Sequence, residues 1–202
     1  MPYTLPRGSA SRKTEHPIDP LFVDRWSPRA MSGEAISRAE LLSLLEAARW
    51  APSCFNEQPW RFMYALRDTP NWSRFFELMV EFNQSWTKHS GALLVIASRM
   101  RFTMNNEPNK HHAFDAGAAW AQFALEGWKR GLVVHGMAGI DFDRARKTLA
   151  VPEDYEVICM AAVGRPAGPD VLPPALRERE LPTDRRPVAK FAVEGGFADA
   201  IR

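Results

Sequence analysis

Three short segments of this 202-residue chain combine residue types that could do chemistry. The first is Arg25-Trp26-Ser27-Pro28-Arg29, in which Arg25, Ser27 and Arg29 alternate. Alternate side chains of an extended segment point to one side, so two guanidiniums and a hydroxyl would converge. The forked donors of arginine suit phosphate. The segment predicts an anion site, and the alternative is a solvated basic loop.

The second segment, residues 51–60, reads APSCFNEQPW and places Ser53, Asn56 and Gln58 between two prolines. An amide side chain offers both a donor and an acceptor. A rigid backbone that carries amides therefore suits recognition of the edge of a heterocycle. The alternative interpretation is a tight structural turn.

The third segment is His135-Gly136-Met137-Ala138-Gly139, which we expect between a short strand and a helix. Its two glycines would allow the backbone to approach a ligand closely. The alternative is a plain strand-to-helix turn.

The sequence lacks the motifs that mark several other kinds of site. The chain has no GxxxxGK[ST], no GxGxxG after a predicted strand, no GxSxG and no Cys/His set at metal-ligand spacing. His111 and His112 are adjacent, which on a helix puts them about 100° apart and disfavours joint metal ligation. We expect these histidines at the surface or at a helix cap, and we predict no metal site.

Composition sets the broad class of the protein. Hydrophobic residues make up 46% and charged residues 25% of the chain, and the net charge is only +2. Such a weak field gives no reason to expect nucleic acid or an acidic membrane as a partner. The longest apolar runs are too short to span a bilayer, the N-terminus lacks the apolar core of a signal peptide, and Cys54 and Cys159 form no disulfide pattern. We therefore expect a cytoplasmic protein.

Hydrophobic periodicity and end signals predict the elements that must position these segments. Ser37 and Glu40 form a capping box before a helix that ends at Pro52. We further expect strands at 61–66, 92–97, 132–135 and 155–163, and helices from Thr69 through Phe82, at 112–130 and at 143–150. The helix at 112–130 is apolar all round, which implies burial, either inside one subunit or at the centre of an interface. We predict a flexible leader at 1–17 and a single domain at 18–202, with a C-terminal extension from about 165.

Taken together, the motifs resemble the nitroreductase family. They are the RxSxR segment, APSxxNxQPW, HGMAGIDFDxAR, VPEDYE followed by AVGRP, and a late RRP. The similarity runs from about Asp24 to Phe197, and APSxxNxQPW is its most specific part. It implies an α+β fold with a mixed, largely antiparallel sheet flanked by helices. It also implies an intertwined homodimer with an FMN at each subunit interface.

The resemblance assigns cofactor contacts to particular residues. The FMN phosphate side falls on Arg25, Ser27 and Arg29, together with Trp26 in the same segment and Arg185 late in the chain. The loop that reaches the flavin from the partner subunit falls on Pro52, Ser53, Cys54, Asn56 and Gln58. An amide near the ring or the ribityl chain falls on Asn83, and the segment along the flavin falls on Gly136, Met137, Ala138 and Gly139, with the Ala138 N–H facing N5.

Three positions depart from the family pattern. Many members have a glutamate where Ala138 stands, a second basic residue where Thr183 stands, and some have a lysine where Trp86 stands. These differences leave the substrate class open, and with it the affinity for the cofactor.

The implied activity is a ping-pong transfer of reducing equivalents. FMN would take hydride at N5 from NADH or NADPH and pass electrons to a nitroaromatic, a quinone or a similar small acceptor. No side chain is required as an acid or base, so no catalytic residue is predicted. The alternatives are a flavin enzyme with other chemistry (ene-reduction, dehalogenation or flavin breakdown), a non-catalytic flavin binder, and a domain whose basic motif is only surface.

Overall fold

The computed structural model describes residues 3–197, which form two compact units. The core unit contains residues 3–5 and Ser27–Glu180, and the tail unit contains Pro6–Trp26 and residues 181–197. Each unit is described by itself below.

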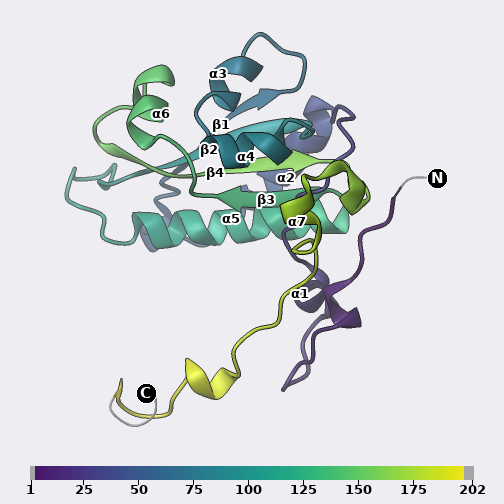
Figure 1. Cartoon of the computed structure of the whole chain (residues 1–202). Helices are drawn as coiled ribbons and strands as arrows, with labels where there is room; N and C mark the ends of the chain where they lie inside the picture. Colours follow the sequence, from purple (N-terminus) through teal and green to yellow (C-terminus); the bar gives the residue numbers. More distant parts are fainter. Residues whose placement is uncertain (1–2, 198–202) are drawn as a thin grey trace. The chain divides into compact units, whose positions relative to one another are not determined.

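A four-stranded sheet lies at the centre of the core unit (Figure 1). Its strands are β1 (Trp60–Leu66), β2 (Ala92–Arg99), β3 (Val133–Met137) and β4 (Tyr155–Gly164), in the spatial order β1-β2-β4-β3. All three pairings are antiparallel, so the α+β class is confirmed. The parallel pairing of a mixed sheet is not found among the described strands. β1 and β3 are the two edges.

Helices cover both faces of this sheet (Figure 1). One face packs against α2 (Arg38–Arg49) and α5 (His112–Lys129). The other packs against α3 (Trp72–Phe76), α4 (Glu81–Thr87), α6 (Phe142–Thr148) and α7 (Pro174–Arg177). Because successive strand residues point to opposite faces, Leu93 and Val95 enter one core and Leu94 enters the other.

Local signals explain where the helices begin and end. The Ser37 hydroxyl accepts from the Glu40 N–H at 3.1 Å, and the Glu40 carboxylate accepts from the Ser37 N–H at 2.8 Å, so the predicted capping box is confirmed. Helix α5 ends before Gly131, whose φ of +70° suits glycine.

The predicted helix from Thr69 through Phe82 is wrong as a single element. The chain forms α3 and α4 with a break between them, and there Met79 forms a β-bridge with Ile140. The Val80 N–H donates to the Gly139 carbonyl at 3.1 Å. Tertiary pairing with the segment after β3 therefore outcompetes helix propensity.

Burial of α5 on all sides is also not found within one chain. Ala116, Phe123 and Gly127 face the sheet, whereas Phe114 is 80% exposed. A Cβ at Gly117 would meet no atom within 4 Å. One face of α5 is thus apolar and exposed in the described structure.

The tail unit is held together by segments from both ends of the chain. A 3-10 turn at Gly8–Ala10 packs on helix α1 (Pro20–Asp24) so closely that a Cβ at Gly8 would lie 2.1 Å from the Val23 carbonyl oxygen. The buried Trp26 indole donates to the Pro6 carbonyl at 2.9 Å. The C-terminal part adds a 3-10 turn at Val188–Lys190. No helix within residues 3–197 has the length and apolar character needed to cross a bilayer.

Candidate functional site

Arg29 is fixed through its backbone by a buried carboxylate. The N–H groups of Arg29 and Ala30 donate to Oε1 of Glu180 at 2.6 and 2.8 Å. Burial lowers the pKa of the Arg29 guanidinium, while Glu180 opposes that shift and Arg179 adds to it. In the described part of the chain, Arg29 Nε and Glu180 Oε2 are buried without a hydrogen-bond partner.

Trp86 and His135 connect this segment to helix α4 and strand β3. The Arg29 guanidinium lies 6.0 Å from the centre of the Trp86 ring, and the His135 ring lies 4.7 Å from it. His135 Nδ1 is 2.9 Å from the Pro28 carbonyl oxygen. Trp86 Nε1 is a second buried donor for which residues 3–197 offer no acceptor.

Asn83, one turn before Trp86 on α4, holds the segment that follows β3. Its Nδ2 donates to the Gly139 carbonyl at 2.9 Å, and a Cβ at Gly139 would lie 2.6 Å from that nitrogen. A Cβ at Gly136 would lie 2.9 Å from the Trp120 ring. Neighbouring atoms therefore leave no room for a side chain at Gly136 or Gly139, so both positions require glycine. His135, Gly136 and Met137 belong to strand β3, so the predicted turn contains only Ala138 and Gly139.

We refer to these residues as the β3-edge cluster: Arg29, Asn83, Trp86, His135, Gly139 and Glu180. The structure thus brings together the predicted arginine segment, the predicted amide on α4 and the predicted glycine segment. Its unmatched donors, Arg29 Nε and Trp86 Nε1, suit a ligand that carries acceptors.

The predicted loop at 52–58 has an unusual backbone. Phe55, Asn56 and Gln58 have φ values of +51°, +55° and +51°. This left-handed region costs a residue other than glycine about 1–2 kcal/mol, although Asn tolerates it better. Phe55 is 81% exposed and meets Phe102 edge-on at a ring distance of 5.8 Å. Strain of this kind is often kept at functional sites.

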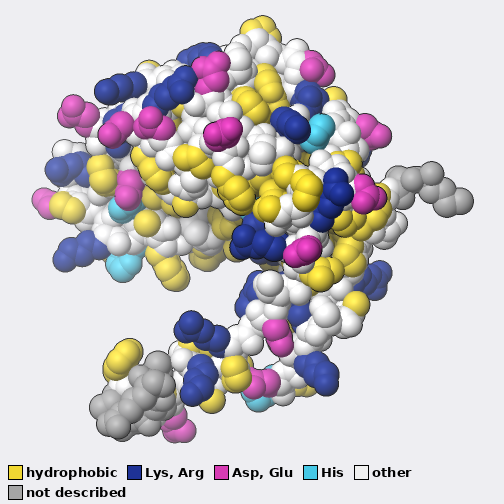
Figure 2. Space-filling view, viewed as in Figure 1, with side chains coloured by type: hydrophobic (Ala, Val, Ile, Leu, Met, Phe, Trp, Pro, Cys, Tyr) yellow, Lys and Arg dark blue, Asp and Glu magenta, His cyan; other side chains and the backbone are white. Residues whose placement is uncertain are grey.

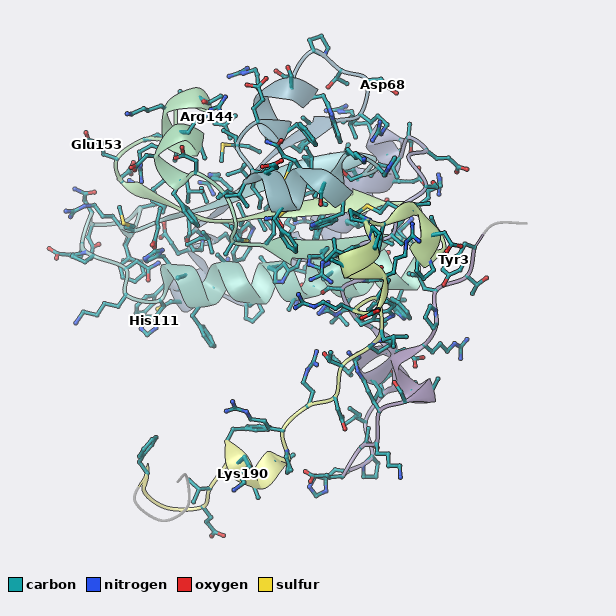
Figure 3. The ribbon with its side chains drawn as sticks, viewed as in Figure 1. Tyr3, Asp68, His111, Arg144, Glu153 and Lys190 are labelled. Carbon is teal, nitrogen blue, oxygen red and sulfur yellow. The ribbon has the colours of Figure 1, made fainter. Side chains whose placement is uncertain are left out.

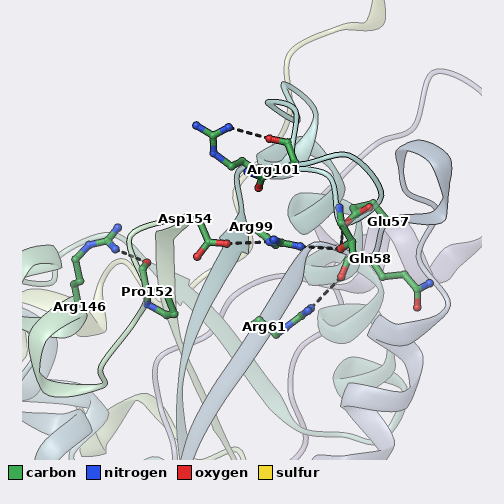
Figure 4. Close-up of polar contacts among 10 residues, drawn as sticks. Glu57, Gln58, Arg61, Arg99, Arg101, Arg146, Pro152 and Asp154 are labelled. Carbon is green, nitrogen blue, oxygen red and sulfur yellow. Dashed lines mark hydrogen bonds and ion pairs between the residues drawn. The ribbon is translucent and has the colours of Figure 1, made fainter.

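Hydrogen bonds hold the loop in this conformation, and Figure 4 shows the one from Arg61 to the Gln58 carbonyl. The Cys54 N–H donates to the buried Asp115 carboxylate at 3.1 Å, and the Gln58 N–H donates to the Ser53 hydroxyl at 3.0 Å. The Thr103 N–H donates to Glu57 at 2.9 Å, and Arg61 donates to the Gln58 carbonyl at 3.1 Å. The loop is anchored to α5 and to the connection that precedes it.

The loop and the β3-edge cluster belong to opposite edges of the sheet. The loop leads into β1, whereas Gly139 follows β3, and strands β2 and β4 lie between them. With neighbouring strands about 4.8 Å apart, three spacings amount to roughly 14 Å. One chain therefore does not bring these two sets of predicted residues together.

The remaining predicted residues lie in or next to the tail unit. Burial lowers the pKa of Arg25 most, and the neighbouring Arg185 and Arg12 lower it further. Arg185 donates from Nη1 to the Thr183 carbonyl at 3.1 Å. Arg25, Trp26 and Arg185 are in the tail unit, and Ser27 begins the main stretch of the core unit.

Sequence reasoning missed three residues that hold these segments: Arg12, Asp115 and Glu180. Glu180 lies in a charged stretch that is typical of solvated surface, and Arg12 lies in the predicted leader. For these two, no local pattern indicates burial. No cluster of three His, Cys, Asp or Glu side chains suited to a metal ion occurs in the described residues.

Comparison with known proteins gives consistent matches. The model of the Nitroreductase family matches residues 23–77 and 65–165. A Streptomyces coelicolor protein is 26% identical over 183 residues, 80% of this chain and 90% of its own length, and its name proposes an NADH dehydrogenase or NAD(P)H nitroreductase.

Two solved structures show the same fold. One, described as an oxidoreductase containing FMN, is 44% identical, has a TM-score of 0.89, and aligns over 92% of this chain and 96% of its own. The other, from Desulfovibrio desulfuricans, was determined in complex with FMN and is described as a candidate nitroreductase. It is 23% identical with a TM-score of 0.69, and aligns over 91% of this chain and 99% of its own.

Proposed function

Because the chain belongs to the nitroreductase family, we propose that it transfers electrons from NADH or NADPH to a nitroaromatic, quinone or similar small acceptor. The enzyme class, an FMN-dependent oxidoreductase, and the cofactor agree with the FMN-containing relative at 44% identity. The observation that carries the proposal is the pair of buried donors without acceptors in the β3-edge cluster. Residues 18–202 would act as one FMN-binding domain.

The residues of the β3-edge cluster fit a flavin. Arg29 Nε and Trp86 Nε1 are donors, and the edge of an isoalloxazine carries carbonyl and ring-nitrogen acceptors. An unmatched buried donor costs about 1–3 kcal/mol, which a ligand acceptor would recover. We propose that Arg29 and Trp86 contact the ring and that Ala138, which is exposed at the end of β3, presents its N–H toward N5.

The phosphate end is assigned to Arg25, Ser27 and Arg185. Arg25 and Arg185 lie close enough in the tail unit to influence one another electrostatically. Charge-assisted hydrogen bonds from arginine to phosphate are among the strongest in proteins.

Bound FMN would supply the redox chemistry, and the chain would supply position and environment. Glu180 holds the backbone of Arg29, and Asn83 holds the carbonyl of Gly139, so both sides of the proposed ring site are fixed before a ligand arrives. No side chain is assigned as an acid or base.

We also propose a homodimer in which the 52–58 loop of one subunit completes the flavin site of its partner. The separation of the two sets of residues within one chain supports this arrangement, because a flat ring needs contacts on more than one side. The exposed face of α5, with Phe114 and Gly117, offers an apolar surface for the contact. A two-fold axis would make both sites equivalent.

The first experiment measures the cofactor. Purified protein should be yellow, and anaerobic NADH or NADPH should bleach the flavin spectrum rapidly. A colourless protein that takes up no added FMN would refute the proposal. Bound flavin that neither nucleotide reduces would instead support the non-catalytic flavin binder.

The second experiment tests the shared site by subunit complementation. Arg29→Ala and Asn56→Ala homodimers should each bind FMN weakly. A heterodimer of the two, isolated with two affinity tags, should regain one high-affinity site, because one site carries both changes and the other carries neither. If both residues serve the same subunit's site, each heterodimer site is damaged and no recovery occurs.

The third experiment tests the phosphate end. Removing a charge-assisted hydrogen bond costs about 1.5–3 kcal/mol. The Arg25→Ala/Arg185→Ala double variant should therefore bind FMN at least about tenfold more weakly. Unchanged affinity would show that these arginines do not hold the cofactor.

A further inference from the structure

Arg25 and Arg185, the two proposed phosphate contacts of the tail unit, come from opposite ends of the chain. Lys and Arg side chains recur along this unit (Figure 2). Two cations do not approach one another unless the backbones that carry them are held. The contacts of a third arginine show what holds them.

Arg12 bridges the backbone at both positions. Its Nε donates to the Thr183 carbonyl at 2.7 Å, two residues before Arg185. Its Nη1 donates to the carbonyls of Val23 and Arg25 at 2.7 and 2.8 Å. One guanidinium therefore ties the backbone of Arg25 to the C-terminal segment.

Glu15, three residues after Arg12, makes a second contact with the C-terminal segment. Its carboxylate accepts from the Val188 N–H at 2.7 Å. Thr183 and Val188 lie on either side of Arg185, so residues 12 and 15 hold the segment that carries it at both ends. The N-terminal segment thereby fixes the part of the C-terminal segment that contains this cation.

The side chains of the three arginines are also neighbours. The Thr183 carbonyl that accepts from Arg12 Nε also accepts from Arg185 Nη1 at 3.1 Å. The pKa of Arg12 is lowered, first by burial and then by Arg185, although Asp184 and Asp24 oppose the shift. An anion placed among these groups would relieve their mutual repulsion.

We propose that Arg12 is a positioning residue, which orders Arg25 and Arg185 so that together they bind the phosphate of FMN. The inference rests on the proposed function. It adds that residues before the family's arginine motif take part in cofactor affinity. Arg12 acts through backbone carbonyls, so the planar arrangement of its donors matters more than its charge.

The test compares FMN with riboflavin, which lacks the phosphate, by spectral titration of the apoprotein. Arg12→Ala should raise the Kd of FMN about tenfold and change the Kd of riboflavin less than about twofold, a selective loss equal to about 1.4 kcal/mol. Arg12→Lys keeps the charge but not the fork, and should resemble Arg12→Ala. Glu15→Gln should also raise the Kd of FMN, but by a smaller factor.

Arg7→Ala is the matched control, because Arg7 lies in the same unit with an exposed side chain 4.0 Å from Asp24. It should leave both Kd values unchanged. Equal weakening of FMN and riboflavin by the Arg12 variants would overturn the inference, as would full rescue by lysine. If the wild-type protein showed no preference for FMN over riboflavin, the proposed phosphate site itself would fail. Should Arg12→Ala not fold, Arg12→Lys and Glu15→Gln decide the matter.

Discussion

The β3-edge cluster and the 52–58 loop differ in how they depart from an ordinary folded structure. In the cluster the Arg29 N–H and the Gly139 carbonyl have hydrogen-bond partners, and the unmatched groups are two side-chain donors and one carboxylate oxygen. In the loop the hydrogen bonds are made, and the unfavourable feature is the backbone, with Phe55 and Gln58 at positive φ. The cluster therefore has two unmatched donors and one unmatched acceptor, whereas the loop presents a fixed shape. A ligand bound between two subunits would use both features.

This contrast is tested most strongly at Glu180. Glu180→Ala removes the acceptor of the partly buried Arg29 N–H and of the buried Ala30 N–H, and both donors then lack a partner. At about 1–3 kcal/mol for each donor, the free energy of unfolding should fall by roughly 2–6 kcal/mol. Urea unfolding at one fixed protein concentration measures the change.

Glu178→Ala is the control for this variant, because Glu178 is exposed in the same segment. It should change stability by less than about 0.5 kcal/mol. If Glu180→Ala were equally mild, the backbone of Arg29 would not depend on the buried carboxylate.

The corresponding support of the loop is Asp115. Asp115→Ala leaves the Cys54 N–H without its carboxylate acceptor, and a hydrogen bond to a charged group contributes about 1.5–3 kcal/mol. Unfolding free energy should fall by that amount, and the loop amides should exchange hydrogen faster. Asp115→Asn keeps an acceptor oxygen and should lose less. Unaltered exchange at residues 54–58 would mean that the loop keeps its shape without this anchor.

Asn83 gives a smaller effect within the β3-edge cluster. The Gly139 carbonyl also accepts from the Val80 N–H, so Asn83→Ala should cost only about 1 kcal/mol of stability. FMN affinity should nevertheless fall, because Asn83 holds the segment next to the proposed ring site. Gln84→Ala is the matched control, since its amide donates to the Met79 carbonyl at 2.9 Å. Gln84→Ala should lose a similar amount of stability and keep its affinity for FMN. An equal loss of FMN affinity in both variants would argue against a specific role for Asn83.

The two regions also differ in how far the sequence could predict them. The strands and the capping box at Ser37 follow from periodicity and end signals, which are local. That Arg29, Asn83 and Gly139 contribute to one site was implied only by the resemblance to the nitroreductase family. Glu180 could not be identified, because its burial depends on a backbone contact with a segment about 150 residues away. The break between α3 and α4 has the same origin, because the pairing of Met79 with Ile140 cannot be predicted from the sequence of either segment alone.

The positive φ values of the loop also could not be predicted from the sequence. Phe55 and Gln58 are not residues that favour the left-handed region, so propensity alone predicts an ordinary turn. The strain arises because Asp115, Ser53 and Glu57 hold the loop at several points. Tertiary contacts overrule the local preference, as they do at Glu180.

The smallest expected change in stability is at Phe55, where a glycine variant distinguishes the role of the backbone conformation from that of the side chain. Phe55→Gly relieves the strain at φ +51°, but it also increases the entropy of the unfolded chain, and the two terms are each about 1 kcal/mol. Stability should therefore change by less than about 1 kcal/mol. Asp68→Gly is the matched control, because Asp68 has φ +61° in an exposed turn after β1 (Figure 3). Both variants should unfold alike, whereas only Phe55→Gly should alter the KM for an aromatic electron acceptor, since only this loop is proposed to reach the partner's flavin. Equal KM values for the wild type and both glycine variants would confine the role of Phe55 to the shape of its own turn.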